Sequence, residues 1–200
     1  MNKHANTSPK PASLPWYLVA NAWECPADQA HLRAPFAELS TTWKLLLLSD
    51  GSVTRHLQLL TGEPTTVDVL SMTAIGMDGD GAPACISEIP GPRLRRQVVL
   101  HNQSGQRLAY AASWWQEDEV NTYLRDKALP IWVSLASQKA ELFRDIRQLF
   151  YGESAALDEL FGSTGPYWGR YYFFWHDQRP LTLIYEVFSP AIQEYLNADD

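Results

Sequence analysis

Two strand–turn–strand units constrain the fold of this chain most strongly. In the first unit, residues 94–101 and 107–115 read as strands and are separated by a short turn that contains Ser104 and Gly105. In the second unit, residues 168–175 and 181–188 flank a five-residue turn in the same way. Strands joined by short turns pair antiparallel. The two units therefore predict an antiparallel β-sheet.

Apolar side chains recur at helical spacing outside these units. Phe36, Leu39 and Trp43 share one face of such a segment, and Ser52 is placed to cap a helix that begins at Val53. Helices combined with an antiparallel sheet predict an α+β fold, with the helices covering one side. We expect helices over 36–48, 53–60, 116–125, 131–150 and 153–161, a terminal helix after Ser189, a further strand over 65–70, and a short helix or turn at 16–23.

The length and the apolar content predict one folded domain. The chain has 200 residues, of which 46% are hydrophobic, enough for a single core. Residues 1–13 are polar and contain several prolines, so we expect a disordered lead-in followed by one domain over 14–200. The longest strongly apolar run, residues 45–48, is far too short to cross a bilayer. We therefore expect a soluble, cytoplasmic monomer.

Composition and motifs exclude several classes of function. The formal net charge is −7, which disfavours binding to nucleic acid or to an anionic membrane. Cys25 and Cys85 lie far apart, so we expect two buried thiols rather than a metal site. The loop at 76–83 lacks the closing glutamate of a calcium loop, and the phosphate-binding, zinc-protease and serine-hydrolase motifs do not occur. We expect an enzyme of this kind to use no metal and no cofactor.

A few charged residues occupy unusual positions in the predicted strands. Arg95 and Arg96 are adjacent and must point to opposite faces, so we expect one to be solvated and the other to face inward. Arg170 is flanked by aromatic residues, and Glu186 lies among apolar ones. A buried charge needs a partner or a ligand. These residues therefore indicate either an ion pair that ties the strands together or a pocket for a small anion.

Four segments, taken together, resemble one known family. They are residues 48–57, residues 94–100 with their hairpin return, residues 130–145 beginning with Pro130-Ile131-Trp132, and residues 168–190. In this order and spacing they resemble the chorismate pyruvate-lyase family over about three quarters of the chain. That family converts chorismate to 4-hydroxybenzoate and pyruvate, and the product supplies the ring of ubiquinone or plastoquinone.

The resemblance implies a fold and a set of site residues. It implies an antiparallel sheet with an internal ligand cavity and no metal or cofactor. Arg96 matches the arginine that binds the ring carboxylate, and Glu186 matches the carboxylate that holds the 4-hydroxyl. Contacts around Val53, Thr54 and Ile131 are expected to line the cavity.

The sequence also departs from the family pattern and leaves one role open. Trp132 replaces a frequent glycine, Gln97 replaces a glutamate that can follow the arginine, and the second hairpin turn is one residue longer. We assign Arg170 either to the enolpyruvyl carboxylate of chorismate or to a pairing role. The substrate and product partners would then be chorismate and 4-hydroxybenzoate.

Three functions remain open from the sequence. The first is a cofactor-independent carbon–oxygen lyase, with Arg96 and Glu186 as its catalytic residues. The second is a non-catalytic carrier or sensor that binds small aromatic acids in the same cavity. The third is a structural domain in which Arg96 pairs with Glu186 and no small molecule binds.

Overall fold

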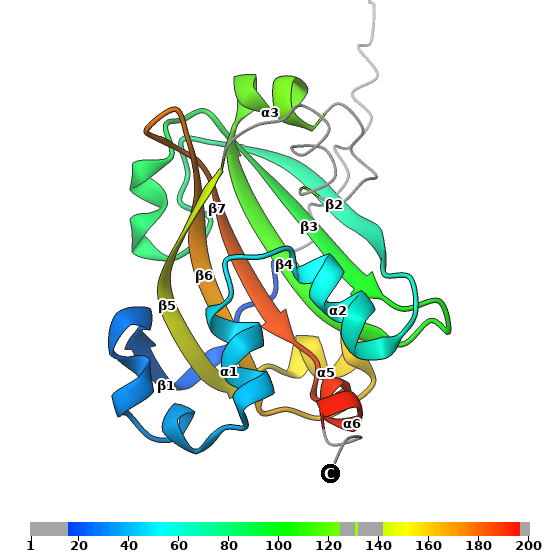
Figure 1. The fold of residues 1–200 in the computed structure, drawn as a ribbon. Coiled ribbons are helices and arrows are strands. Elements are labelled where there is room, and N and C mark those ends of the chain that lie inside the picture. Colours follow the sequence, from blue (N-terminus) through cyan, green and yellow to red (C-terminus); the bar gives the residue numbers. More distant parts are fainter. Residues whose placement is uncertain (1–15, 125–130, 132–141, 197–200) are drawn as a thin grey trace, which may run out of the picture.

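The protein is built around a seven-stranded, fully antiparallel sheet (Figure 1). The computed structural model describes residues 16–124, 131 and 142–196, so the predicted lead-in over 1–13 lies outside the described residues. The strand order is β1-β5-β6-β7-β4-β3-β2. The strands are β1 Ala20–Pro26, β2 Thr66–Gly76, β3 Arg93–His101, β4 Arg107–Gln116, β5 Phe143–Glu153, β6 Tyr167–His176 and β7 Arg179–Phe188.

The two predicted hairpins form the centre of this sheet. β3 pairs with β4, β6 pairs with β7, and the two hairpins join through the β4–β7 pair. The second turn is tighter than expected, because Asp177 and Gln178 both have positive φ angles of 48° and 60°. Positive φ at both central residues is what a two-residue hairpin turn of the I′ type requires. The return strand consequently begins at Arg179.

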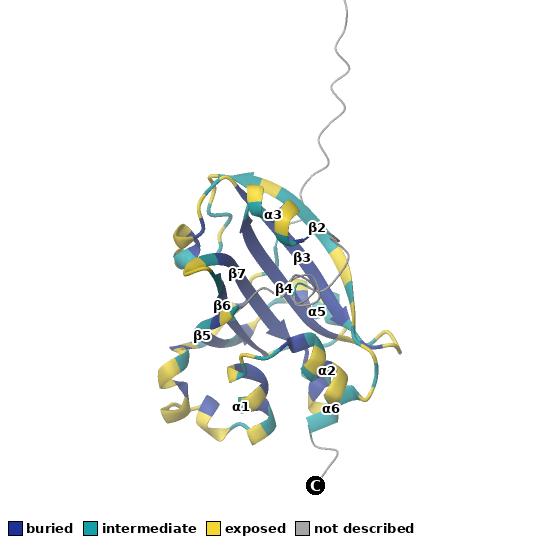
Figure 2. Cartoon of the chain, turned by 45° about the horizontal axis from the view of Figure 1, so that its top comes forward, coloured by how far each residue is buried: buried dark blue, intermediate teal, exposed yellow. Residues whose placement is uncertain are grey.

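Helices and short segments cover both faces of the sheet. Buried side chains of α1, α2 and α3 belong to clusters on one face, together with η1, η2 and η4. α5, η3 and residues 16–19 pack on the opposite face. Figure 2 shows the buried central strands and the exposed outer sides of the helices. The bounds are α1 Thr41–Leu48, α2 Val53–Thr61, α3 Glu117–Tyr123, α5 Ala155–Phe161, α6 Gln193–Leu196, η1 Ala27–Leu32, η2 Phe36–Glu38, η3 Ala84–Glu88 and η4 Pro190–Ile192.

The helix beside the cavity begins where its cap was predicted. Ser52 accepts a hydrogen bond from the backbone N–H of Arg55, and α2 starts at the next residue, Val53. Gly62, with φ of 70°, ends the helix in the left-handed conformation. The predicted helix over 36–48 is instead divided, because Ser40 caps a new helix after the single turn of η2.

The helix predicted over 131–150 is wrong where the structure describes it. Residues Phe143–Glu153 form strand β5, and residues 132–141 lie outside the described part of the chain. The β5–β6 register shifts between Ile146 and Gln148. This bulge brings Ile146 and Leu149, three residues apart, into the same cluster, although an uninterrupted strand would place them on opposite faces. The resulting spacing imitates that of a helix.

The short helix or turn expected within residues 20–23 is also wrong. This segment belongs to β1, which pairs with β5 at the edge of the sheet. Most of its residues are exposed, and Cys25 is its buried residue. Because an exposed edge strand has little alternation between polar and apolar side chains, the pattern in the sequence did not identify it.

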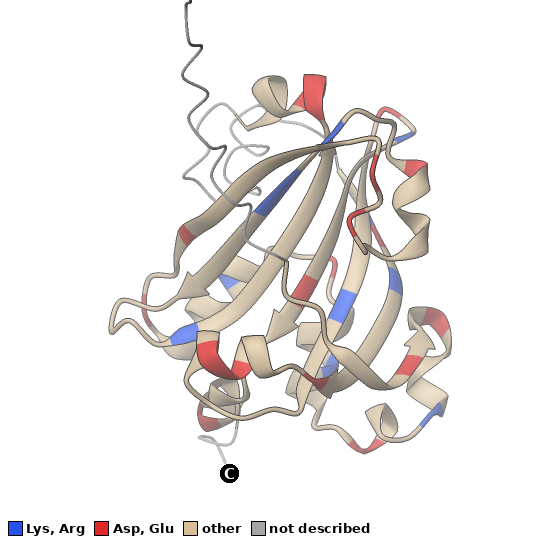
Figure 3. Cartoon of the chain, turned by 180° about the vertical axis from the view of Figure 1, so that it is seen from behind, with Lys and Arg blue, Asp and Glu red and all other residues tan. Residues whose placement is uncertain are grey.

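A loop over residues 76–83 holds β3, the strand that carries the adjacent Arg95 and Arg96, on the face opposite the cavity. Arg93 donates to the backbone carbonyls of Met77 and Asp78, and Arg95 forms an ion pair with Asp80. Arg95 is buried as well as Arg96, so the expectation that one of the two adjacent arginines is solvated is wrong. Arg96 points to the opposite face, as the alternation of a strand requires. Figure 3 shows the sheet from behind, with basic positions on the strands themselves.

No helix among the described residues is long and apolar enough to cross a membrane.

Candidate functional site

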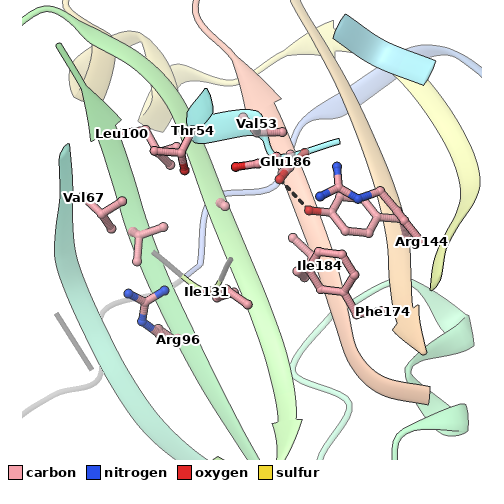
Figure 4. A pocket seen from close by; sticks show the side chains of 14 residues that line it. Val53, Thr54, Val67, Arg96, Leu100, Ile131, Arg144, Phe174, Ile184 and Glu186 are labelled. Atoms are coloured by element: carbon pink, nitrogen blue, oxygen red, sulfur yellow. Dashed lines mark hydrogen bonds between the residues drawn. The ribbon is translucent and has the colours of Figure 1, made fainter. Parts of the chain in front are cut away.

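A small cavity lies between the sheet and the start of α2 (Figure 4). It leaves about 60 Å³ for the centres of water molecules, which corresponds to roughly four to six waters. This is the size class of a single substituted ring rather than of a nucleotide. The lining residues are Ser52, Val53, Thr54, Val67, Arg96, Val98, Leu100, Ala111, Ile131, Arg144, Tyr172, Phe174, Ile184 and Glu186.

Five of the residues singled out in the sequence meet at this cavity. Val53 and Thr54 come from the first turn of α2, Arg96 from β3 and Glu186 from β7, and Ile131 also lines it. They come from four distant parts of the chain, which the sheet brings together. Trp132, the departure from the family pattern, lies outside the described residues.

Glu186 is held from two sides by hydrogen bonds to its carboxylate. Its Oε2 accepts from Nε of Arg170 at 2.9 Å, and its Oε1 accepts from the hydroxyl of Tyr172 at 2.6 Å. Burial raises the pKa of Tyr172, so its phenol remains a proton donor. Each carboxylate oxygen can accept more than one hydrogen bond. Glu186 is therefore fixed in orientation and can still accept a hydrogen bond from a ligand.

Arg170 lies behind Glu186 and is not among the lining residues. Its side chain is fully buried, with 0% exposure. Nη1 donates to the carbonyls of Leu47 and Ser49, both at 2.9 Å. Arg170 thus joins the end of α1 to the carboxylate of Glu186, and the ion pair of Glu186 is with this residue rather than with Arg96.

Arg96 reaches the cavity from the other side of β4. Its exposure is 1%, and burial lowers its pKa to about 10, which leaves the guanidinium charged at neutral pH. Arg96 faces Ser113 on β4, and Glu186 faces Ala111 on the same strand. Two strand spacings and two residues along β4 separate the two backbones by on the order of 12 Å. The two charged groups therefore line the cavity from opposite sides of β4.

Arg144 and Tyr172 line the cavity but were not among the site residues expected from the sequence. Arg144 was assigned to a helix, whereas it lies on β5 with its guanidinium carbon 4.4 Å from the ring centre of Tyr172 and 4.9 Å from that of Phe174. Tyr172 stands two residues after Arg170 and therefore on the same face of β6. That spacing was the available signal for Tyr172, and no local signal pointed to Arg144.

The described residues offer no metal centre and no reactive thiol near this cavity. They contain no group of three or more His, Cys, Asp or Glu side chains placed to hold a metal ion. Cys25 and Cys85 are free thiols; Cys25 is buried as expected, whereas Cys85 is half-buried. Burial raises the pKa of Cys85 to about 11. The charged and phenolic side chains that line the cavity are Arg96, Arg144, Tyr172 and Glu186.

A histidine near the cavity predicts a loss of stability in mild acid. Burial lowers the pKa of His56, and the charges of Arg170 and Arg144 lower it further. Below a pH of about 6.5 the unfolded chain binds a proton at His56 more readily than the folded protein does, so the free energy of unfolding falls as the pH drops. We expect His56→Gln to lose less stability between pH 7.5 and 5.5 than the wild type in urea titrations. The exposed His31→Gln is the control, and equal losses in His56→Gln and the wild type contradict the assignment.

The sequence matches a family model and several related proteins. A family model described as chorismate pyruvate-lyase Rv2949c-like matches residues 47–196. The uncharacterized protein ycf21 of Cyanophora paradoxa is 37% identical over 151 residues, which cover 76% of this chain and 78% of that protein. The ycf21 protein of Pyropia yezoensis is 32% identical over 153 residues, covering 76% of this chain and 83% of the relative.

Solved structures show the same fold. The effector domain of PhnF from Mycobacterium smegmatis superposes with a TM-score of 0.57 at 13% identity, over 72% of this chain and 92% of that one. The gene product SA0254 from Staphylococcus aureus gives a TM-score of 0.55 at 15% identity, over 72% and 90% of the two chains. At this level of identity the likeness concerns the fold alone, and it confirms the predicted α+β class.

Proposed function

This chain belongs to the Rv2949c-like chorismate pyruvate-lyase family, and on that premise we propose that it is a cofactor-independent lyase that cleaves chorismate to 4-hydroxybenzoate and pyruvate. The observation that carries the proposal is the cavity, which Arg96 and Glu186 line from opposite sides of β4. A product of this kind supplies the ring of a quinone, the role that the family resemblance implies.

The two charged groups suit the two ends of the ring. A guanidinium binds a carboxylate through two parallel hydrogen bonds, so Arg96 is assigned to the ring carboxylate. Glu186 is assigned to the 4-hydroxyl, which donates to an oxygen that Arg170 and Tyr172 keep in place. The apolar residues between them, such as Val98 and Ile184, contact the ring faces.

The reaction balances without a further reactant. The bond between ring carbon C3 and the ether oxygen breaks, and that oxygen becomes the carbonyl of pyruvate. The hydrogen on C4 passes to the enolpyruvyl methylene, which becomes the methyl group, and the electron pair of the C4–H bond completes the aromatic ring. Aromaticity supplies the driving force, so the protein has to hold a reactive conformation in a site that excludes water.

A pyruvate assay tests the proposal directly. We expect purified protein incubated with chorismate to release pyruvate and 4-hydroxybenzoate in equal amounts, followed with a coupled dehydrogenase. Binding of 4-hydroxybenzoate without release of pyruvate would support the alternative, a carrier of small aromatic acids. Absence of both would support a structural domain, in which the buried charges only hold the strands together.

Glu186→Gln separates an orienting role from proton transfer. We expect kcat/KM to fall roughly 10- to 150-fold, because a hydrogen bond to a charged group contributes about 1.5–3 kcal/mol. The preference of the protein for 4-hydroxybenzoate over benzoate, which lacks the hydroxyl, should fall by a similar factor. A loss of activity beyond about 10⁴-fold with an unchanged preference would instead identify Glu186 as a proton-transfer group. Melting temperatures of both proteins control for the changed charge.

A further inference from the structure

We propose that Arg144 binds the second carboxylate of a dianionic ligand, the carboxylate of the enolpyruvyl group in chorismate. The inference rests on the proposed function and adds a specificity-determining residue to it. It moves to Arg144 a role that the sequence left open for Arg170.

Arg144 is a buried cation, and some of its N–H groups have no hydrogen-bond acceptor. Its exposure is 7%, and its Nε and Nη1 atoms are buried without a hydrogen-bond partner. Within the described ranges, no ion pair of Arg144 is present either. Burying a charged donor without a partner is costly. An anion that enters the cavity and accepts from this guanidinium removes that cost.

The aromatic neighbours of Arg144 do not supply hydrogen-bond acceptors for its Nε and Nη1 atoms. Its guanidinium lies over the rings of Tyr172 and Phe174, and all three residues line the cavity. The two rings attract the charge of the guanidinium, and they leave its Nε and Nη1 N–H groups without a hydrogen-bond acceptor. N–H groups of a guanidinium can bind a carboxylate in a bidentate manner.

The position of Arg144 matches the position of the second carboxylate. Tyr172 contacts Arg144 and donates to Glu186, so Arg144 lies at the Glu186 side of the cavity, whereas Arg96 lies across β4 (Figure 4). In chorismate the enolpyruvyl ether is attached to the ring carbon next to the one that bears the hydroxyl. A ring bound between Arg96 and Glu186 therefore directs its second carboxylate towards the side that Arg144 occupies.

Arg170, by contrast, already has partners for most of its donors. It binds Glu186 and the carbonyls of Leu47 and Ser49, and it does not line the cavity. Since Arg170 already balances the charge of Glu186, Arg144 and Arg96 remain as the cations that face a dianion among the described lining residues. The product 4-hydroxybenzoate carries one carboxylate and makes no use of Arg144.

Binding of a matched pair of ligands tests this assignment without turnover. The monoanion is 4-hydroxybenzoate, and the dianion is 3-(carboxymethoxy)-4-hydroxybenzoate, which carries a carboxylate where chorismate has its enolpyruvyl group. In isothermal titration calorimetry we expect Arg144→Gln to raise the Kd of the dianion at least 30-fold and to change the Kd of the monoanion less than threefold. Where the wild type turns chorismate over, KM should rise more than kcat falls.

Arg147→Gln is the control on the same strand. Arg147 is a partly exposed cation that pairs with Glu88 and Asp145 and does not line the cavity, so neither Kd should change. Arg144→Lys keeps the charge but loses the bidentate geometry, and we expect an intermediate loss for the dianion alone. If Arg144→Gln fails to fold, Arg144→Lys still tests whether Arg144 binds the second carboxylate.

The outcomes distinguish this inference from the proposed function. A wild-type protein that binds the dianion through Arg144 but releases no pyruvate refutes the lyase and leaves the Arg144 assignment standing. Turnover combined with an equal effect of Arg144→Gln on both ligands, or with no effect on either, overturns the assignment and leaves the lyase standing. A wild-type protein that binds the monoanion as tightly as the dianion also overturns it.

Discussion

Arg96→Ala is expected to lower kcat/KM for chorismate by roughly 30- to 5,000-fold, which corresponds to about 2–5 kcal/mol. The variant removes the guanidinium assigned to the ring carboxylate and leaves that carboxylate without a charged partner in a buried site. Because the product keeps the ring carboxylate, the Kd of 4-hydroxybenzoate should rise by a similar factor. Steady-state kinetics and calorimetry measure the two quantities.

The neighbouring arginine provides a matched control. Arg95 has the same side chain and is equally buried, but it pairs with Asp80 on the far face of the sheet. Arg95→Ala should therefore reduce stability and leave the affinity for 4-hydroxybenzoate unchanged. A near-wild-type kcat/KM for Arg96→Ala, measured on folded protein, means that the ring carboxylate binds elsewhere.

Arg170→Met is expected to reduce the free energy of unfolding by about 3–5 kcal/mol, because removing one partner of a buried ion pair leaves the other charge uncompensated. The charge left behind is Glu186, and the carbonyls of Leu47 and Ser49 lose their donor as well. Urea denaturation at neutral pH measures the loss. Arg170→Lys, which keeps the charge, should lose less.

A double-mutant cycle tests whether the ion pair causes this loss. Replacing both partners of a buried pair with apolar groups is often nearly neutral, so Arg170→Met combined with Glu186→Leu should be less destabilised than the sum of the single variants. Additive effects within about 0.5 kcal/mol would show that the pair does not couple, and that Arg170 stabilises the protein only through the end of α1.

The elements that were predicted correctly are those whose defining residues lie within one continuous segment of the sequence. Both hairpins have turns and strands in continuous segments, and Ser52 stands directly before the helix that it caps. The predictions for the segments that form β5 and β1 were wrong for different physical reasons. A bulge gave β5 the spacing of a helix, and the exposed edge strand β1 has no alternation to detect.

The residues of the candidate site also divide into those that the sequence identified and those that it did not. The family pattern identified Arg96 and Glu186, and the structure brings both to one cavity. The contact between Arg144 and Tyr172 depends on β5 lying beside β6. This pairing was not predicted, because residues 131–150 were assigned to a helix. Arg170, by contrast, faces Glu186 across the predicted β6–β7 hairpin, and the ion pair that the sequence offered as one interpretation forms between them.

The loop at 76–83 has a consequence for how the chain tolerates changes in length. The loop holds Arg93 through the carbonyls of Met77 and Asp78, and it holds Arg95 through Asp80. If β3 slid by one position against its neighbours, Arg95 would take the inward place of Arg96 and the cavity would receive the wrong side chain. Insertions and deletions in this loop should therefore be rarer among functional homologues than in the turn between β3 and β4, even though no residue of the loop lines the cavity.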